Sequence, residues 1–319
     1  MAETRDKIRC PVVNIAAAGD TVLVVGPEKL RLRVQSLVLK AVSKLLGTIL
    51  GPDWKEGDDI RGAGLPVEIL LPEENATALR CICAVLHHQV KLIPQIMAVN
   101  DILRIAVTAN KFGVIDALAF ASEFWLCPPN KGASDLIVLA AAATLFKNIQ
   151  AFRDITKALI LNYGGFYLDL SSEDVVSVLG ERVFCLLEEQ RGFARLKLGE
   201  ILIGGINAPA CVHRCGWTSK YAFAYMKLLE THNLWPTALS VVGEAIERAH
   251  RMPHPVPEES SAECRFGYKH CAPEYRDFIR YGLDDLTSRI GICLHCFHSN
   301  RVGPGFCQMA HGYQYLSDQ

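Results

Sequence analysis

The stretch that decides the fold is residues 20–34, which read DTVLVVGPEKLRLRV. Its first half is a run of β-branched and other apolar residues, and its second half alternates apolar residues with Arg31 and Arg33. An alternation with a period of two is typical of a strand with one buried face. Gly26-Pro27 lies between the halves and is a turn signal. The stretch therefore predicts two strands joined as a hairpin.

The chain beyond the hairpin changes its period in a definite order. Residues 35–50 have helical spacing, and Ser43 is predicted to be the N-cap that divides them into two helices. Residues 51–64 are rich in Gly and Asp and predict a loop, and residues 67–71 predict a third strand. The next predicted elements are a helix that follows Pro72 and a pair of helices, over 101–109 and 114–126, hinged at Gly113.

Short motifs mark these elements. They are Asp20 with the apolar run 22–25, Val34-Gln35-Ser36-x-x-Leu39 followed by Ser43, the strand 67–71 with Pro72-Glu73-Glu74, and Leu103-x-x-Ala106 followed by Ala109-Asn110-Lys111-Phe112-Gly113. In this order they resemble the BTB/POZ domain, although Gln35 stands where that family usually has His. The resemblance implies an α+β domain over residues 19–127, a small sheet with helical pairs. It also implies protein–protein interaction and self-association as a homodimer.

The remainder of the chain is divided by composition. Residues 133–252 predict an all-α extension, residues 253–263 a Pro/Ser/Glu linker, and residues 264–319 a small Cys/His-rich tail that packs on the extension. Residues 1–18 form an N-terminal segment, of which 8–15 could add a strand or a helix to a dimer. The helices predicted in the extension cover 134–146, 152–163, 172–189, 196–202, 219–232 and 236–250.

The strongest chemical signal is in the tail. Cys293-Leu294-His295-Cys296 is a CxxC, a turn that can present two thiolates to one ion, and zinc prefers four nitrogen or sulfur ligands. A tail of this size buries too little apolar surface to fold alone, which gives a metal a structural purpose. The predicted structural zinc site is formed by Cys264, Cys271, Cys293 and Cys296.

Other ligand sets stay open. His270 could replace one of the cysteines, and Cys307 and His311 could substitute in the same site or complete a second one. Reduced thiols packed in a small subdomain are the alternative to any metal. Cys211-x-His213-x-Cys215 is interpreted as packing, because alternate spacing points its ligands in different directions.

A second resemblance spans nearly the whole chain. Leu234-Trp235-Pro236 in the helical extension precedes Gly291-Ile292-Cys293-Leu294-His295-Cys296 in the tail. The pair of elements is similar to BTB-domain proteins of filamentous fungi, in which a helical region with such an element precedes a terminal Cys-rich motif. That group is largely uncharacterised, so this resemblance implies an architecture and no specific activity.

Charge and hydropathy exclude several classes of function. Lys and Arg number 33 against 34 Asp and Glu, so the net charge of −1 predicts no nucleic-acid partner and no acidic membrane surface. The longest apolar run, 136–146, is shorter than the roughly 20 residues that a membrane helix needs. Neither a secretion signal nor a catalytic motif such as G-x-S-x-G or HExxH is found. We expect an intracellular, cytoplasmic or nuclear protein that is not an enzyme.

One short motif suggests a specific partner. Trp54-Lys55-Glu56 lies in the loop before the third strand. BTB adaptors of cullin ubiquitin ligases often carry a hydrophobic-x-Glu there, so the resemblance implies Trp54 and Glu56 as partner-binding residues for a cullin. A substrate adaptor is therefore the alternative to a self-associating interaction module, and a metal-dependent regulator or enzyme is the second alternative.

Overall fold

The computed structural model describes residues 11–51, 66–127, 131–207, 213, 215–235, 241–256, 264–270, 275–299 and 305–307. They form a mixed α+β protein, with a small sheet near the N-terminus followed by helices, as predicted. The chain divides into two compact units, residues 1–152 and 153–319. We refer to them as the first and the second unit.

The sheet of the first unit has the strand order β1-β3-β2-β4. The predicted hairpin is present, since β2 and β3 pair antiparallel with Leu23 opposite Leu32. β4 adds to β2 in parallel, and a short β1, from within the 8–15 stretch, pairs in parallel with β3 of its own chain. The strands are β1 (Val12–Asn14), β2 (Thr21–Val25), β3 (Leu30–Val34) and β4 (Val67–Leu71).

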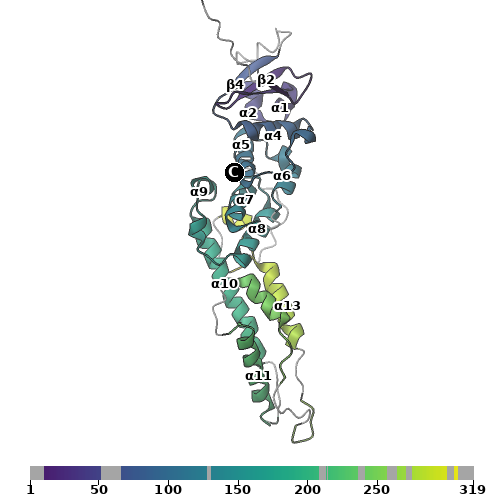
Figure 1. Cartoon of the computed structure of the whole chain (residues 1–319), viewed down its shortest axis with the longest axis vertical. Helices are drawn as coiled ribbons and strands as arrows, with labels where there is room; N and C mark the ends of the chain where they lie inside the picture. Colours follow the sequence, from purple (N-terminus) through teal and green to yellow (C-terminus); the bar gives the residue numbers. More distant parts are fainter. Residues whose placement is uncertain are drawn as a thin grey trace, which may run out of the picture. The chain divides into compact units, whose positions relative to one another are not determined.

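Two predicted helix signals of the first unit are found, and the helix expected over 114–126 is instead a 3-10 turn followed by a shorter α-helix. Ser43 caps α2: its hydroxyl accepts from the Leu46 amide at 3.0 Å and donates to the Phe112 carbonyl at 2.6 Å. Gly113, at φ +66°, ends α5. Figure 1 shows α1, α2 and α4 beside the sheet. The helices are α1 (Ser36–Val42), α2 (Lys44–Ile49), α4 (Ala76–Leu86), α5 (Val99–Phe112), α6 (Ala119–Trp125) and α7 (Ala133–Leu145), with 3-10 turns η1 (Val90–Leu92) and η2 (Asp116–Leu118).

The second unit is helical in the part of the chain that the structure describes. Its longest helix, α10, packs against α12 and α13 (Figure 1). The unit boundary falls within α8, so α7, predicted to belong to the helical extension, is part of the first unit, where it packs on α5. The helices are α8 (Ile149–Asn162), α9 (Glu173–Leu179), α10 (Arg182–Gly204), α11 (Trp217–Thr231), α12 (Val242–Arg251), α13 (Tyr275–Arg289) and α14 (Leu294–His298), with 3-10 turns η3 (Tyr167–Leu170) and η4 (Gly205–Asn207).

One predicted helix is wrong in its extent. The helix expected over 172–189 is interrupted at Gly180, whose φ of +68° is left-handed and ends α9. α10 then starts at Arg182 and continues to Gly204, so it absorbs the helix predicted separately over 196–202. The break between the two helices was expected between residues 189 and 196, but it lies at Gly180. The sequence shows where glycines are, but not at which of them the backbone becomes left-handed.

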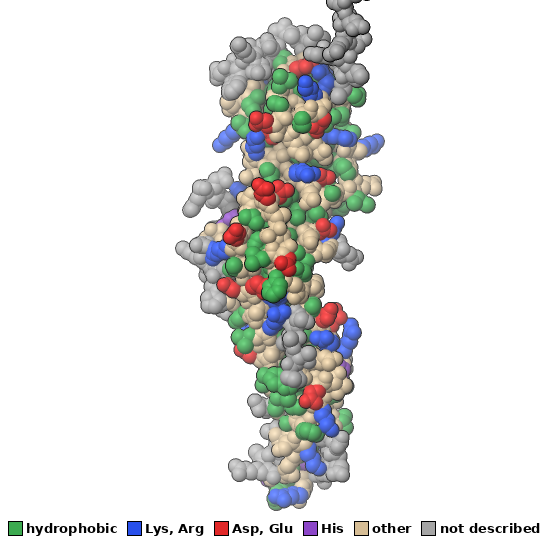
Figure 2. Space-filling view, turned by 60° about the vertical axis from the view of Figure 1, so that its left-hand side comes forward, with side chains coloured by type: hydrophobic (Ala, Val, Ile, Leu, Met, Phe, Trp, Pro, Cys, Tyr) green, Lys and Arg blue, Asp and Glu red, His purple; other side chains and the backbone are tan. Residues whose placement is uncertain are grey.

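The surface carries charges of both signs. On the face drawn in Figure 2, Lys and Arg side chains are interspersed with Asp and Glu among the described residues, and apolar side chains lie between them. No helix in the described ranges is long and apolar enough to cross a membrane.

Candidate metal centres

Two clusters of cysteine and histidine lie in the second unit. One contains Cys215, Cys264 and His270, and the other contains Cys293, Cys296 and Cys307. Within each cluster the sulfur and nitrogen atoms lie within 4.8 Å of one another, so each could hold a metal ion. Ligands of a tetrahedral zinc ion, at bond lengths of about 2.0–2.3 Å, lie about 3.5–3.8 Å apart.

The CxxC supplies two members of the second cluster. Cys293 is the N-cap residue of α14, and Cys296 lies in the first turn of that helix. The Cys293 carbonyl accepts the first helical hydrogen bond, from the Phe297 amide at 2.9 Å. Both thiols therefore belong to one rigid helical turn, as the spacing predicts.

Helix α8 holds the chain that enters this turn. The Ile292 amide donates to the Thr156 hydroxyl at 3.0 Å, and the Arg153 guanidinium donates to the Ser288 carbonyl at 3.0 Å. Gly291 has a φ of +127°, and a Cβ atom there would lie 2.8 Å from the Arg153 carbonyl oxygen. Only glycine allows this approach, so the position of the CxxC depends on Gly291.

Helix α10 holds the segment that carries Cys307. The Gln190 side chain donates to the Gly305 carbonyl at 2.8 Å, and the Phe306 ring packs edge-on against Phe193 with centroids 4.9 Å apart. These contacts place the Cys307 sulfur 3.5 Å from that of Cys296. The third member of the cluster is thus positioned by the helix and not by its own secondary structure.

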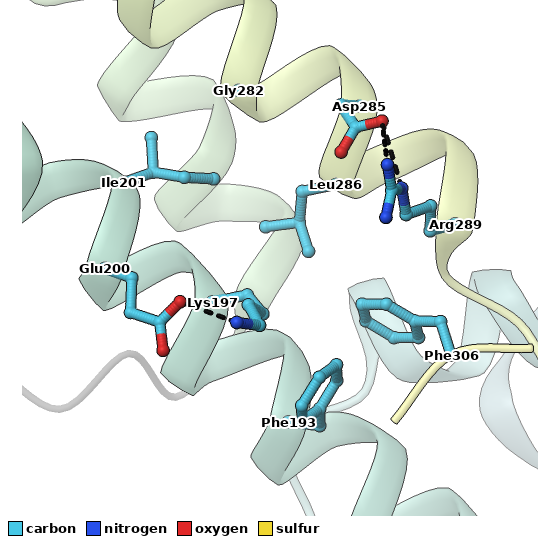
Figure 3. Close-up of a pocket in the computed structure, with 9 residues that line it drawn as sticks. All are labelled: Phe193, Lys197, Glu200, Ile201, Gly282, Asp285, Leu286, Arg289 and Phe306. Atoms are coloured by element: carbon cyan, nitrogen blue, oxygen red, sulfur yellow. Dashed lines mark hydrogen bonds and ion pairs between the residues drawn. The ribbon is translucent and has the colours of Figure 1, made fainter. Parts of the chain in front are cut away.

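A cavity of about 280 Å³ adjoins this contact, between α10 and α13. Figure 3 shows Phe306 facing Phe193 at its rim, with Leu286 and Ile201 among the lining residues. The charged groups at its edge are engaged with each other, Lys197 with Glu200 at 2.7 Å and Arg289 with Asp285 at 2.9 Å. Paired charges around an apolar floor offer little to orient a polar ligand.

The electrostatics of the second cluster suit a cation. Burial, followed by the hydrogen bond with Cys307 and the neighbouring Cys293, raises the pKa of the Cys296 thiol to about 12. The Cys296 thiol therefore resists ionisation as long as nothing compensates its charge. A divalent cation supplies that compensation and converts coordinating thiols into thiolates.

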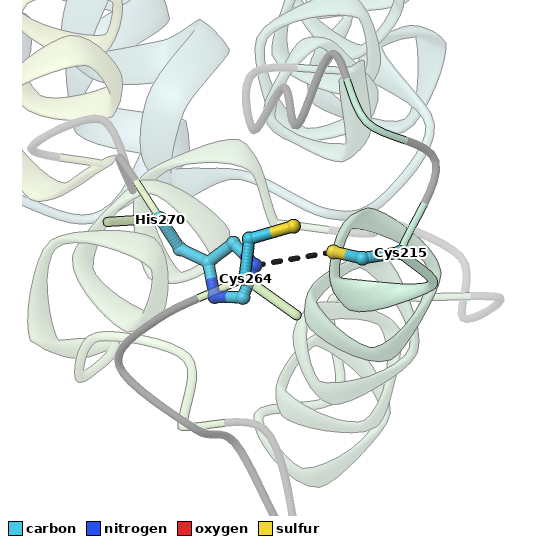
Figure 4. Close-up of side chains that lie close together, drawn as sticks. All are labelled: Cys215, Cys264 and His270. Carbon is cyan, nitrogen blue, oxygen red and sulfur yellow. Dashed lines mark hydrogen bonds between the residues drawn. The ribbon is translucent and has the colours of Figure 1, made fainter. Parts of the chain in front are cut away.

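The first cluster begins with a tight turn. The Cys264 amide donates to the Tyr268 carbonyl at 2.6 Å, and the Gly267 amide donates back to the Cys264 carbonyl at 2.7 Å. Gly267 has a φ of +79°, which glycine adopts at no steric cost. The turn buries Cys264 and is followed by His270, and Figure 4 shows both residues beside Cys215.

The start of α11 supplies the third member of the first cluster. The His270 ring stacks on Trp217 at 4.7 Å with an interplanar angle of 11°, and its Nε2 lies 3.1 Å from the Cys215 sulfur (Figure 4). Cys215 precedes Gly216, the left-handed N-cap residue of α11. His213 stacks on Tyr268 at 4.5 Å and ties the same two segments together.

The predicted ligands are divided between the two clusters. Cys293 and Cys296 lie together and are joined by Cys307, whereas Cys264 lies with His270 and Cys215. Two of the alternatives, His270 and Cys307, thus belong to clusters. Cys215 was missed, because its spacing from Cys211 suggested packing. Cys271, His311, Trp54 and Glu56 lie outside the described residues, and the cullin contact of the last two stays a prediction.

Comparisons of the chain with protein-family models, with curated proteins and with solved structures found no match. Any function assigned to this chain therefore rests on its own residues and geometry.

Proposed function

We propose that this chain is a non-catalytic protein–protein interaction protein that self-associates through its first unit. In this proposal the first unit is a BTB/POZ-like domain that forms a homodimer. The helical second unit carries a tail stabilised by structural zinc and offers surface to other proteins.

The observation that carries the proposal is an exposed apolar face on α1. Leu37 is 71% exposed, although Leu39 in the same helix is fully buried. Ala41 is exposed one turn after Leu37, on the same side of the helix, and Leu45 of α2 is 41% exposed. Exposed apolar side chains on one face of a helix are typical of an interaction site. A two-fold axis would place such a face against its own copy.

The motif residues support the BTB/POZ reading because they contact one another. The Asp20 carboxylate accepts hydrogen bonds from the Ser36 amide at 2.7 Å and from the Ser36 hydroxyl at 2.6 Å. Asp20 directly precedes β2 and Ser36 begins α1, so these bonds join the two elements. Ser43 bonds to the Phe112 carbonyl and so ties α2 to the end of α5. The order of the elements in this unit is the one on which the resemblance was based.

The test compares two leucines of equal exposure. Leu37 on α1 and Leu70 on β4 are each 71% exposed, so a change to lysine has a similar effect on solubility at either position. We expect light scattering of the full chain at micromolar concentration to give twice 35.2 kDa for the wild type and for Leu70→Lys. Leu37→Lys is expected to give the mass of one chain, because a charge is costly in an apolar interface.

Two results would contradict the proposal. A wild-type chain that is monomeric under these conditions would contradict the proposed self-association. A dimer that persists in Leu37→Lys and dissociates in Leu70→Lys would move the interface from α1 to the β4 edge.

A further inference from the structure

We propose that this chain binds two zinc ions, one at Cys215, Cys264 and His270 and one at Cys293, Cys296 and Cys307. The inference deepens the proposed function, since it specifies the metal sites of the second unit. Zinc binding does not itself depend on self-association, so the two can fail separately.

The ligand chemistry selects the metal. Five of the six ligands are cysteine sulfurs and one is an imidazole nitrogen. Soft thiolate ligands, alone or with imidazole, favour zinc over hard cations such as magnesium and calcium, which prefer oxygen. The described parts of the two clusters contain no carboxylate.

The spacing fits an ion in each cluster. The sulfurs of Cys296 and Cys307 lie 3.5 Å apart, and the Cys215 sulfur lies 3.1 Å from the His270 nitrogen. The sulfur–sulfur distance matches the separation of about 3.5–3.8 Å in a tetrahedral zinc site, and the sulfur–nitrogen distance is shorter than that. A disulfide would need its sulfurs about 2.05 Å apart. The donor atoms of each cluster all lie within 4.8 Å of one another, so small side-chain movements would bring them onto one ion.

Independent scaffolds argue for two sites instead of one. The first cluster is built on the turn after Cys264 and on the start of α11, where Trp217 orients the histidine. The second is built on α14 and on the segment that Gln190 and Phe193 hold against α10. Each set of contacts would fix its own cluster in the absence of the other.

Each ion would have a separate structural task. Cys215 and His270 are 55 residues apart, and Cys296 and Cys307 are 11 residues apart. Residues 264–270 and 305–307 lie outside the helices. Segments without regular structure need another restraint, and a metal that joins them to a helix supplies one. Three ligands leave one position of each tetrahedron for water or for a further ligand.

The experiment counts zinc in the full-length chain. Protein purified after expression with added Zn²⁺ is measured by native mass spectrometry and by elemental analysis. We expect two zinc ions per wild-type chain and one in each of Cys215→Ser and Cys307→Ser. The double variant is expected to hold none. Cys127→Ser and Cys185→Ser are matched controls, because these cysteines are exposed and belong to neither cluster, and they should keep two ions.

Other counts would overturn the inference. A single ion that both Cys215→Ser and Cys307→Ser remove would mean one shared site. A chain with no zinc, or one lighter by two hydrogen masses with a Cys296–Cys307 disulfide, would mean that the clusters are not metal sites.

Two further measurements keep the test decisive. The wild-type count distinguishes zero, one and two ions even when a variant fails to fold, and Cys307→His, which retains a ligand, should keep two. Light scattering of the same sample reports self-association separately: a monomer with two zinc ions would support this inference and contradict the proposed function.

Discussion

The two units of the molecule bury different kinds of polar side chain. Among the described residues of the first unit, every buried polar side chain is a serine or threonine hydroxyl. The second unit instead buries a guanidinium and an amide, those of Arg191 and Gln190, together with the hydroxyl of Thr156. The buried hydroxyls of the first unit belong to Thr21, Ser36, Ser43, Thr108, Ser122 and Thr144.

These side chains also have different partners. In the first unit Thr144 donates to the Ala140 carbonyl within its own helix, and Ser43 donates to the Phe112 carbonyl of another helix, so each of these hydroxyls donates to one carbonyl. In the second unit Arg191 donates to the carbonyls of Tyr163 and Gly165 at 3.0 and 2.7 Å, and its guanidinium lies 4.6 Å from the centre of the Tyr167 ring. Arg191 thereby fixes the irregular chain between α8 and α9.

The comparison teaches that the units are held together in different ways. The first unit packs regular elements against each other through apolar residues such as Leu23 and Leu32. The second unit has segments that form neither helix nor strand, and it holds them with long polar side chains and with the Cys/His clusters. Removal of metal should therefore affect the second unit and leave the first unchanged.

Removal of the proposed zinc ions is the largest expected effect. A metal ion whose free concentration is about 1,000 times its Kd stabilises the folded state by about 4 kcal/mol. A strong chelator should therefore lower the free energy of unfolding of the second unit by roughly that amount for each ion. Hydrogen exchange followed by mass spectrometry should show faster exchange in peptides that contain Cys264 and Cys296. Peptides from β2 and β3 should be unchanged. Equal acceleration in both units, or none, would contradict the comparison.

A single buried hydroxyl gives the next effect. Thr156→Val keeps the shape of the side chain but leaves the buried Ile292 amide without its acceptor. A buried donor that loses its partner costs about 1–3 kcal/mol, and the cost should appear as a lower urea midpoint for the second unit.

The control for this change is Thr231→Val. The Thr231 hydroxyl donates only within α11, to the Lys227 carbonyl, and is exposed. If Thr156→Val destabilises the chain no more than Thr231→Val, the anchor on α8 does not hold the CxxC turn.

Much of the first unit could be predicted because its signals are local. The alternation in 30–34, the Ser43 cap and the break at Gly113 each act within a few residues, and each is found as predicted. The break at Gly180 could not be located in the same way. Gly192 and Gly199 lie inside α10 without ending it, so the effect of a glycine depends on the packing around it.

In the candidate metal sites, too, local patterns could be predicted and tertiary contacts could not. The CxxC pair is a local pattern, and its two thiols do lie together. Cys215 and His270 are joined by tertiary packing across 55 residues, which spacing in the sequence does not reveal. For the same reason Cys264 was grouped with Cys293 and Cys296, because residue types indicate a kind of ligand and not which ligands meet.

The smallest expected effect concerns Asp20, a carboxylate of the first unit. Burial raises the pKa of Asp20, but the hydrogen bonds from Ser36 and Thr21 lower it more, so the pKa lies below its ordinary value. A lowered pKa means that the carboxylate stabilises the fold above the ordinary aspartate value of about 3.9, and that this contribution is lost as the pH falls through the lowered value.

Asp20→Asn should therefore lower the stability of the first unit at neutral pH and have little effect at a pH below the lowered pKa. The carboxylate is partly exposed, so we expect a loss of about 0.5–1 kcal/mol. Urea unfolding at several pH values measures it, with Asp116→Asn, an exposed position in η2, as the control. A variant whose stability stays parallel to that of the wild type at every pH would show that the charge of Asp20 does not matter. The hydrogen bonds from Ser36 would then stabilise the first unit without any contribution from the charge of the carboxylate.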